Sequence, residues 1–487
     1  MSFNSSLPIH NLETRPIAQG QSRQLELFNI CWAIATLFHL ANHHIFTDSF
    51  WNVLLTISAI LLLSKPSSVG RLIILLVIQL FQIAVAMPGV VNHWIFTAFV
   101  NLSILQVVVY QVVKTRTFVI NKELLLQNFA PVVRLELLVF YFFVVFHKLN
   151  SGFFTPEVSC ATEFLTAQDS TGVFIRNWRL LALNAHFTIV VETLIPILLI
   201  FRKTRYLGLL IGLVFHCLLG FNPKDGFYDF SSMIFATYLL FTTDKFTTEV
   251  YCLYKKLLVW KNNFKNRLTS FSFSRLGGVV MLIFLVFGLL LVFVKVVGTG
   301  DFFRDFFWTA FNLVFIIPFL FAMLRTKNGS VERGKNIFRV PSWTLLIFPV
   351  LVFLNGFSPY LGLKTENSFA MFSNLRTEGG KSNHYLIPAS AQIFDYQNDL
   401  VEVISSSDSM LTESATKKEF LVFFAFKNYV QIKKPARIEY VRNGARRVFE
   451  YKNPVKHNDL MVPDSKLLRK LMSFRAISKS DPAPCYH

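Results

Sequence analysis

Long apolar runs separated by short polar breaks dominate the first three quarters of the chain. Most runs hold about 15–25 residues, the length at which an α-helix crosses the hydrocarbon core of a bilayer. The runs cover approximately residues 25–45, 50–64, 71–88, 93–113, 131–147, 186–201, 206–222, 229–243, 276–298, 305–324 and 342–357. We therefore expect a mainly α, polytopic helical membrane protein with about 9–11 spans.

The pattern changes after residue 357, where apolar and polar residues alternate over short stretches, as in β-strands with one buried face. The strand-like stretches are 393–404, 421–426 and 437–452. The last of them surrounds Asn443-Gly444, a strong signal for a tight hairpin turn. We expect a cytoplasmic segment 1–24, a transmembrane domain 25–357 and a small β-rich domain 358–487 on the non-cytoplasmic side.

Basic residues gather on one side of the expected membrane. The chain carries 48 Lys and Arg against 29 Asp and Glu, a formal net charge of +19, although only 16% of its residues are charged. Counting the breaks alternately from a cytoplasmic N-terminus puts most Lys and Arg in cytoplasmic breaks, as in other membrane proteins. The same count puts Lys148 and the C-terminal domain outside the cytoplasm, at a plasma or inner membrane, or at an endoplasmic reticulum membrane in a eukaryote. Topology accounts for the charge, so we expect membrane lipid as a partner and no nucleic acid.

Ionisable residues inside apolar runs are rare and usually face a cavity. Here they gather at the non-cytoplasmic ends of the runs, and the set comprises His39, His43, His44, His93, His147, Lys148, His186, Glu192 and His216. Interfacial anchoring explains a lone histidine well. Glu192, inside an apolar helix, needs a partner or stays protonated. Lys148, His186 or a neighbouring helix can supply that partner, so a structural ion pair and a functional site both stay open for Glu192.

Lys148 follows the run 131–147 and opens the long loop that begins at Asn150. One interpretation is an anchor, with the side-chain stem in lipid and the ammonium among the headgroups. The other is a base that partial burial keeps neutral. The histidines and Glu192 at the same expected depth favour the base, because perturbed lysines cluster at functional sites.

Metal and thiolate chemistry receive little support. His39 and His43 have the i, i+4 spacing of a helical metal pair, but the clearly intramembrane histidines do not. The five cysteines include no CxxC and no zinc spacing, and we expect no metal. Cys160 and Cys485 both fall in expected non-cytoplasmic parts, and the sequence leaves their pairing open.

Several short motifs follow one another in a fixed order. They are Asn92-His93, the run 141–150 with His147-Lys148-Leu149-Asn150 at its end, the segment from His186 through Glu192 to His216-Cys217, and the stretch 362–376. Together they resemble the vitamin K-dependent γ-carboxylases and the wider group of HTTM (horizontally transferred transmembrane) domain proteins. The resemblance covers about residues 25–455.

The resemblance implies an activity and roles for matching residues. It implies a membrane enzyme that couples O2-dependent epoxidation of vitamin K hydroquinone, or a related quinol, to carboxylation of glutamate in a protein or peptide by CO2. Lys148 matches the lysine that acts as the base, and His93 matches the histidine that assists carboxylation. The implied quinol or substrate pocket contains Asn92, His147, Asn150, His186, Glu192 and His216.

The chain departs from the carboxylase pattern in two places. Asn150 stands where the carboxylases have an aspartate, and Ser368-Phe369-Ala370-Met371-Phe372 lacks the acid of their aromatic–acid–Met–Met run. Two other functions stay open: a protein of the same fold that binds a lipid or quinone without carboxylase activity, and a transporter with Glu192 and the histidines as a proton relay. A transporter more often has duplicated halves, which this sequence does not show.

Overall fold

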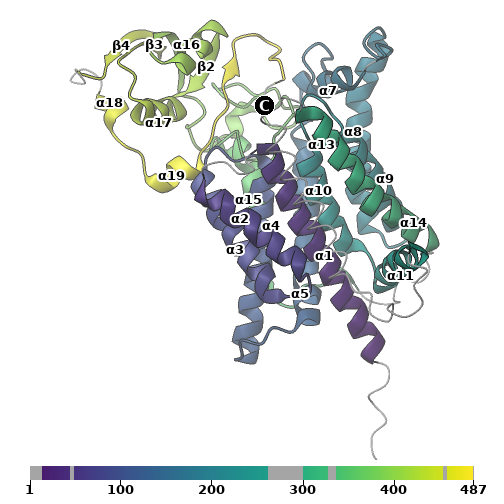
Figure 1. The fold of residues 1–487 in the computed structure, drawn as a ribbon. Helices are drawn as coiled ribbons and strands as arrows, with labels where there is room; N and C mark the ends of the chain where they lie inside the picture. Colours follow the sequence, from purple (N-terminus) through teal and green to yellow (C-terminus); the bar gives the residue numbers. More distant parts are fainter. Residues whose placement is uncertain are drawn as a thin grey trace, which may run out of the picture. The chain divides into compact units, whose positions relative to one another are not determined.

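The computed structural model describes residues 14–43, 49–169, 171–261, 300–326, 336–452 and 458–485. The chain is mostly helical (Figure 1) and forms two compact units. Unit 1 comprises Met1–Gln82, Val100–Leu135 and Ile197–Leu346, and unit 2 comprises Ile83–Phe99, Glu136–Pro196 and Ile347–His487. Each unit draws on three separate stretches, so both depend on contacts between residues that are distant in sequence. The expected boundary at residue 357 stays a prediction.

Most helices of the first 361 residues follow the apolar runs. The helices are α1 (Thr14–His43), α2 (Phe50–Ser64), α3 (Val69–Ala86), α4 (Asn92–Thr115), α5 (Lys122–Phe146), α6 (Ser151–Phe154), α7 (Cys160–Gln168), α8 (Trp178–Ile200), α9 (Arg205–Leu219), α10 (Tyr228–Tyr238), η1 (Leu239–Phe241), α11 (Asp244–Lys261), α13 (Gly300–Phe311), η2 (Asn312–Ile316), α14 (Ile317–Arg325), η4 (Trp343–Leu346), α15 (Ile347–Phe357) and η5 (Ser358–Leu361). Of these, α6, α7 and α11 lie in the breaks between the runs. The run 276–298 lies outside the described residues.

Seven of the described helices are long and apolar enough to cross a membrane, against the 9–11 spans expected. They are Arg23–Asn42, Val69–Ala86, Asn92–Thr115, Lys122–Phe146, Trp178–Ile200, Asp305–Arg325 and Trp343–Leu361. The apolar helices α2 and α9 are shorter, with 15 residues each. In place of the span expected at 229–243, α10 has 11 residues, all of them buried. A short run that is apolar because it is buried on all sides resembles a membrane span in sequence.

Helix α1 lies at the centre of unit 1, where it packs beside α2, α10 and α11 (Figure 1). Side-chain amides join the helices around it. Trp32 Nε1 donates to Gln79 Oε1 at 3.3 Å and to Asn101 Oδ1 at 3.2 Å, and Asn29 Nδ2 donates to the Pro66 carbonyl at 2.7 Å. Polar groups among apolar helices need such internal partners, because no water is there to bond them.

The C-terminal part of unit 2 contains an antiparallel sheet. Its described strands are β1 (Leu400–Ser406), β2 (Glu419–Val422), β3 (Arg437–Arg442), β4 (Ala445–Glu450) and β5 (Ile477–Ser478), in the order β4-β3-β1-β2-β5. The accompanying helices are η6 (Ala389–Ala391), α16 (Ser409–Thr416), α17 (Phe423–Lys433), α18 (Asn458–Met461) and α19 (Lys466–Leu471). Strands β2, β3 and β4 group with α16 and α17 in Figure 1. Phe426 and Val430 of α17 join Val401, Ile438 and Phe449 of the strands in one core.

The hairpin prediction is confirmed. Strands β3 and β4 pair directly on either side of Asn443 and Gly444, whose φ angles of 52° and 72° are those of a type I′ turn. The interpretation of 421–426 as a strand is correct only to Val422, because α17 begins at Phe423. Two buried positions four residues apart, Phe426 and Val430, put one face of this helix on the sheet. Strand β1 begins at Leu400 rather than at 393.

Cys160, at the start of α7, forms a disulfide with Cys485, and the two Cα atoms are 5.0 Å apart. The bridge joins residues 325 positions apart and ties the last described residue of the chain to α7. The structure thus answers the pairing question that the sequence leaves open.

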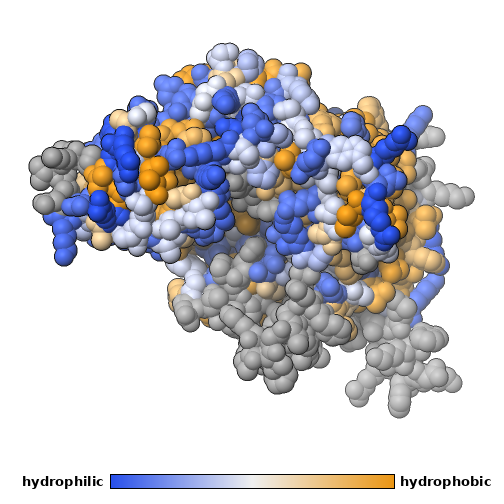
Figure 2. Space-filling model, turned by 90° about the horizontal axis from the view of Figure 1, so that it is seen from above, coloured by the Kyte–Doolittle hydropathy of each residue, from blue (hydrophilic) through white to orange (hydrophobic). Residues whose placement is uncertain are grey.

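The surface seen from above is mainly hydrophilic with scattered hydrophobic patches (Figure 2).

We expect the bridge to be measurable by counting thiols in the denatured protein. Without reductant, three labels should attach, to Cys31, Cys217 and Cys252; after reduction, all five cysteines should react. Mass spectrometry of the alkylated chain gives both counts. A Cys160→Ser control should take up one label more than the wild type without reductant, because Cys485 is released. Five labels on the unreduced wild type would contradict the bridge.

Candidate functional site

Lys148 and Glu192 form an ion pair inside unit 2. Lys148 lies two residues after the end of α5, and Glu192 lies well inside α8. Both are buried, with exposed fractions of 6% and 8%. The ring centroid of Phe153, from α6, lies 5.8 Å from Lys148 Nζ. Because taking a charge out of water costs several kcal/mol, each of these two side chains depends on the other for its place.

Asn150 fixes the turn that carries Lys148 inward. Its side chain is fully buried, and Nδ2 donates to the carbonyls of His147 and Ser373, both at 2.7 Å. Its Oδ1 accepts from Phe153 N–H at 2.9 Å, which caps α6, and from Asn383 Nδ2 at 3.2 Å. An ionised aspartate has no N–H to give to the two carbonyls. An aspartate at this position therefore does not reproduce the network.

His147 ties the end of α5 to the residues that follow α15. Its Nε2 donates to the Ser368 carbonyl at 3.1 Å, since a carbonyl only accepts, and its Nδ1 then accepts from the Tyr360 hydroxyl at 2.9 Å. The ring also stacks on Phe143, with centroids 5.4 Å apart. Both ring nitrogens are occupied in a fully buried place. His147 thus acts as a structural tie next to Lys148.

The segment 367–374 contains four non-glycine residues in the left-handed region. The φ angles are 59° at Asn367, 65° at Phe369, 54° at Phe372 and 54° at Asn374. Backbone conformations of this kind cost on the order of 1–3 kcal/mol each and persist where the surrounding contacts enforce them. Such conformations cluster at functional sites. Here the segment lies beside the turn that holds Lys148, because Asn150 Nδ2 donates to the Ser373 carbonyl.

Hydrogen bonds hold the 367–374 segment against the ends of several helices. Asn92, the first residue of α4, accepts from Phe369 N–H at 2.7 Å. Asn374 Oδ1 accepts from Cys160 N–H at the start of α7, at 2.9 Å. Asn367 Nδ2 donates to the Pro88 carbonyl, just after α3, at 2.8 Å. The segment therefore joins α3, α4, α5 and α7 at their ends in unit 2.

His384 adds a second contact to the end of α5. Its Nε2 donates to the Phe146 carbonyl at 2.9 Å, and its Nδ1 accepts from the backbone N–H groups of Leu386 and Ile387 at 3.2 and 3.1 Å. Burial lowers the pKa of His384, although the bond to the Phe146 carbonyl opposes the shift. The neutral ring has one donor and one acceptor in the places that this arrangement needs.

The remaining predicted site residues are distributed over both units. His93 follows Asn92 in the first turn of α4 and is buried. His186 is exposed on α8, with its ring centroid 5.0 Å from that of Phe154. His216 belongs to unit 1, where it is buried beside the rings of Phe230 and Tyr238. His39, also in unit 1, has Nδ1 3.4 Å from Asp229 Oδ2; His44 and the side chain of His43 lie outside the described residues.

Sequence reasoning did not find Phe153 as a neighbour of Lys148, nor Tyr360, Ser368 and His384 as partners of the residues at the end of α5. The nearest signal was the asparagine content of 367–374, because asparagine tolerates the left-handed conformation better than most residues. Tyr360 and Ser368 reach His147 across more than 200 positions of sequence, and no local pattern encodes such contacts.

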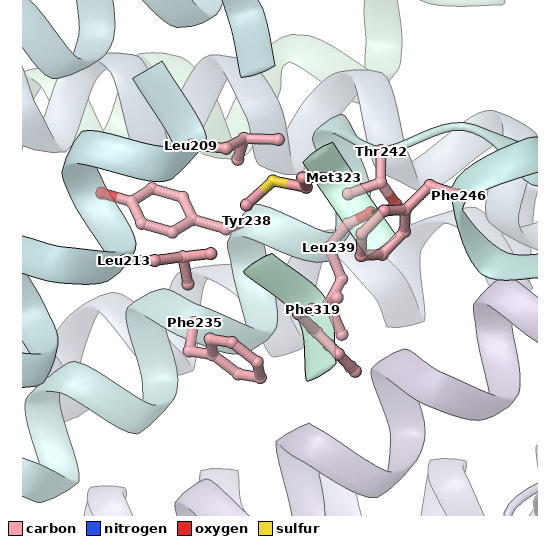
Figure 3. A pocket seen from close by; sticks show the side chains of 9 residues that line it. All are labelled: Leu209, Leu213, Phe235, Tyr238, Leu239, Thr242, Phe246, Phe319 and Met323. Carbon is pink, nitrogen blue, oxygen red and sulfur yellow. Dashed lines mark hydrogen bonds between the residues drawn. The ribbon is translucent and has the colours of Figure 1, made fainter. Parts of the chain in front are cut away.

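Two hollows elsewhere do not contain the pair. In unit 1, nine side chains from α9, α10, η1, α11, α14 and the residue after η1 surround a cavity of about 10 Å³ (Figure 3). It has room for about one water molecule, and Gly212 leaves space there for the Tyr238 ring. In the C-terminal part of unit 2, a hollow of about 310 Å³ lies among charged and aromatic residues. Its charges are engaged, with Lys427 2.7 Å from Asp464 and Asp399 2.7 Å from Arg442.

No protein-family model matches the chain, and neither a curated protein nor a solved structure matches it.

We expect Asn150→Asp to destabilise the protein by at least about 2 kcal/mol, because two buried carbonyls lose their donors and face a carboxylate. Thermal unfolding of the purified protein in detergent measures the loss. Asn177→Asp is the matched control: Asn177 Oδ1 accepts from the N–H groups of Arg179 and Leu180 at the start of α8, and aspartate accepts equally well. Equal unfolding temperatures for the two variants would rule out the proposed network.

Proposed function

We propose that the chain is a multi-pass membrane protein in which the Lys148–Glu192 pair takes a proton from a lipid-soluble hydroquinone. This step begins a carboxylation of the γ-carboxylase and HTTM class. The observation that carries the proposal is the buried ion pair at the end of α5. It occupies the position that the sequence resemblance gives to the catalytic base.

A buried lysine–carboxyl pair suits proton abstraction. The pair holds one shared proton either as ammonium and carboxylate or as amine and carboxylic acid, and both forms are neutral overall. In apolar surroundings the second form avoids burying two charges and presents an unprotonated amine. When the Lys148 amine takes a proton from the hydroquinone, the ammonium that forms lies next to the negative charge left on the hydroquinone oxygen. Glu192 then serves as the group that allows Lys148 to change its protonation in a buried place.

Aromatic side chains of unit 2 support the proposal of an aromatic ligand. Phe153 faces the Lys148 ammonium. The ring of Phe369 contacts that of Phe140, and Phe140 contacts Phe96, with centroid distances of 5.1 and 4.7 Å. Apolar walls exclude water and strengthen the electrostatic contacts within. A bound hydroquinone would supply the electrons for O2 reduction and the strong base that carboxylation needs. His93, in the same unit, is the proposed assistant in the carboxylation step.

Two observations support a non-cytoplasmic place for Lys148. The bias of Lys and Arg among the breaks favours it. The Cys160–Cys485 bridge also favours it, because disulfides form and persist in oxidising compartments. We propose a plasma or inner membrane, or an endoplasmic reticulum membrane in a eukaryote. Glutamate in a protein or peptide, with CO2, is the proposed substrate, and this choice rests on the resemblance alone.

We expect Lys148→Ala to lower hydroquinone epoxidation in membranes by at least about 100-fold, the scale of a lost general base. Chromatographic detection of the epoxide measures the rate. Lys381→Ala is the matched control, since Lys381 is an exposed lysine of the same unit. Its rate should stay at the wild-type level. Wild-type epoxidation in Lys148→Ala would remove Lys148 from the mechanism.

A second variant separates lost chemistry from lost folding. Lys148→Ala leaves Glu192 buried without its counter-charge, which costs about 3–5 kcal/mol. The double variant Lys148→Met/Glu192→Leu removes both charges and keeps apolar volume, so it should unfold at a temperature near that of the wild type. It should nevertheless form no epoxide. A folded double variant that forms epoxide would contradict the proposal.

A further inference from the structure

An exposed apolar turn connects α7 to α8 in unit 2. Val173, Phe174, Ile175 and Trp178 have exposed fractions of 57%, 39%, 51% and 53%. Four large apolar side chains within six positions form a contiguous patch, and such patches on soluble surfaces usually mark contact with a membrane or a partner. We call residues 171–178 the apolar turn.

The backbone of the apolar turn is bonded internally. The Asp169 carboxylate accepts from the N–H groups of Val173, Phe174 and Ile175, at 3.2, 2.6 and 3.0 Å. It also accepts from the Thr171 hydroxyl at 2.8 Å. One carboxylate thus satisfies three successive backbone donors that a turn normally leaves to water.

Arg176 satisfies the carbonyls of the same turn. Its Nε donates to the Gly172 carbonyl at 3.0 Å, and a terminal nitrogen donates to the Thr171 carbonyl at 3.1 Å. A turn in water has no need of these bonds, because water satisfies its backbone. A turn that enters an apolar layer needs them, because each unsatisfied backbone group there costs several kcal/mol. The turn thus satisfies its own backbone groups while its apolar side chains lie exposed.

An exposed apolar stripe on α8 follows the apolar turn in the sequence. Leu183, Phe187, Val190 and Leu194 have exposed fractions of 60%, 59%, 60% and 37%. Their spacing of four, three and four residues places them on one helix face. Only 22% of the apolar window of α8 is buried within the protein. The patch on the turn and the stripe on the helix are thus exposed apolar surfaces that follow one another along the chain.

The length of α8 places its start near the edge of the bilayer. The helix has 23 residues, which extend about 35 Å at about 1.5 Å per residue. The hydrocarbon core is about 30 Å thick, so a helix of this length begins in the interfacial layer. Trp178 and Arg179 there match the preference of tryptophan for the interface and of arginine for the headgroups.

We propose that the apolar turn inserts Val173, Phe174 and Ile175 into the interfacial layer of the bilayer. The insertion fixes the depth of α8 in the membrane, and with it the depth of Glu192. Asp169 and Arg176 act as internal partners that make insertion of this backbone possible. The proposal does not depend on hydroquinone chemistry, so its test and that of the proposed function can fail separately.

The test uses an environment-sensitive fluorophore on a Phe174→Cys variant of the full chain, with Cys31, Cys217 and Cys252 changed to alanine. The protein is placed in phosphatidylcholine vesicles with acyl chains brominated near the headgroup. Asn443→Cys, in the hairpin turn of the sheet, is the control. We expect bromolipid to quench the label at 174 several-fold more than the label at 443, and aqueous iodide to quench mainly the label at 443.

Two results would overturn the proposal. Strong iodide quenching at 174 without bromolipid quenching would place the turn in water. Protection from both quenchers would mean that protein, such as a second copy of the chain, covers it. Asp169→Ala tests the mechanism: with three backbone donors released, bromolipid quenching at 174 should fall by half or more, and unchanged quenching would contradict the role of Asp169.

Discussion

A lysine and a glutamate that are both buried among apolar side chains depend on each other, and much of unit 2 follows from this constraint. Removing one partner would leave an uncompensated buried charge, at a cost of about 3–5 kcal/mol. The Lys148–Glu192 pair therefore links the end of α5 to α8. Replacing such a pair with apolar side chains is often neutral or favourable. Stability alone thus gives little reason for this pair to exist, and that consideration favours a chemical role.

The residues around the pair hold one turn of backbone in place. Asn150 and His147 bond to carbonyls of the 367–374 segment, and His384 bonds to the last carbonyl of α5. Four residues of that segment are in the left-handed region. The C-terminal part of the chain therefore contacts the end of α5 and fixes the direction in which Lys148 points. A substitution in that part should alter the position of Lys148 by shifting the backbone that carries it.

The sequence could predict those features that local chemistry determines. Runs of apolar residues located the helices, Asn443-Gly444 located the hairpin, and charges in apolar runs singled out Lys148 and Glu192. The sequence could not select Lys148 over His186 as the partner of Glu192. That choice depends on how the end of α5 packs against α8, and Lys148 and Glu192 are 44 positions apart in sequence. Only the structure shows the contacts of His147 with Tyr360 and Ser368, and its place in the proposed pocket stays a prediction. For residues 229–243 the sequence pattern does not distinguish burial in a protein core from burial in lipid, since both select the same side chains.

The most direct test of the central claim joins both halves of the proposed reaction in one sample. Purified protein in lipid nanodiscs is given reduced vitamin K, O2, a glutamate-containing peptide and labelled bicarbonate, and epoxide and peptide-bound label are measured together. If the Lys148–Glu192 pair is the proton acceptor of a carboxylase, both products form in the wild type and neither forms in the folded Lys148→Met/Glu192→Leu variant. Absence of both products from the folded wild-type protein, or their formation by the double variant, would contradict the claim.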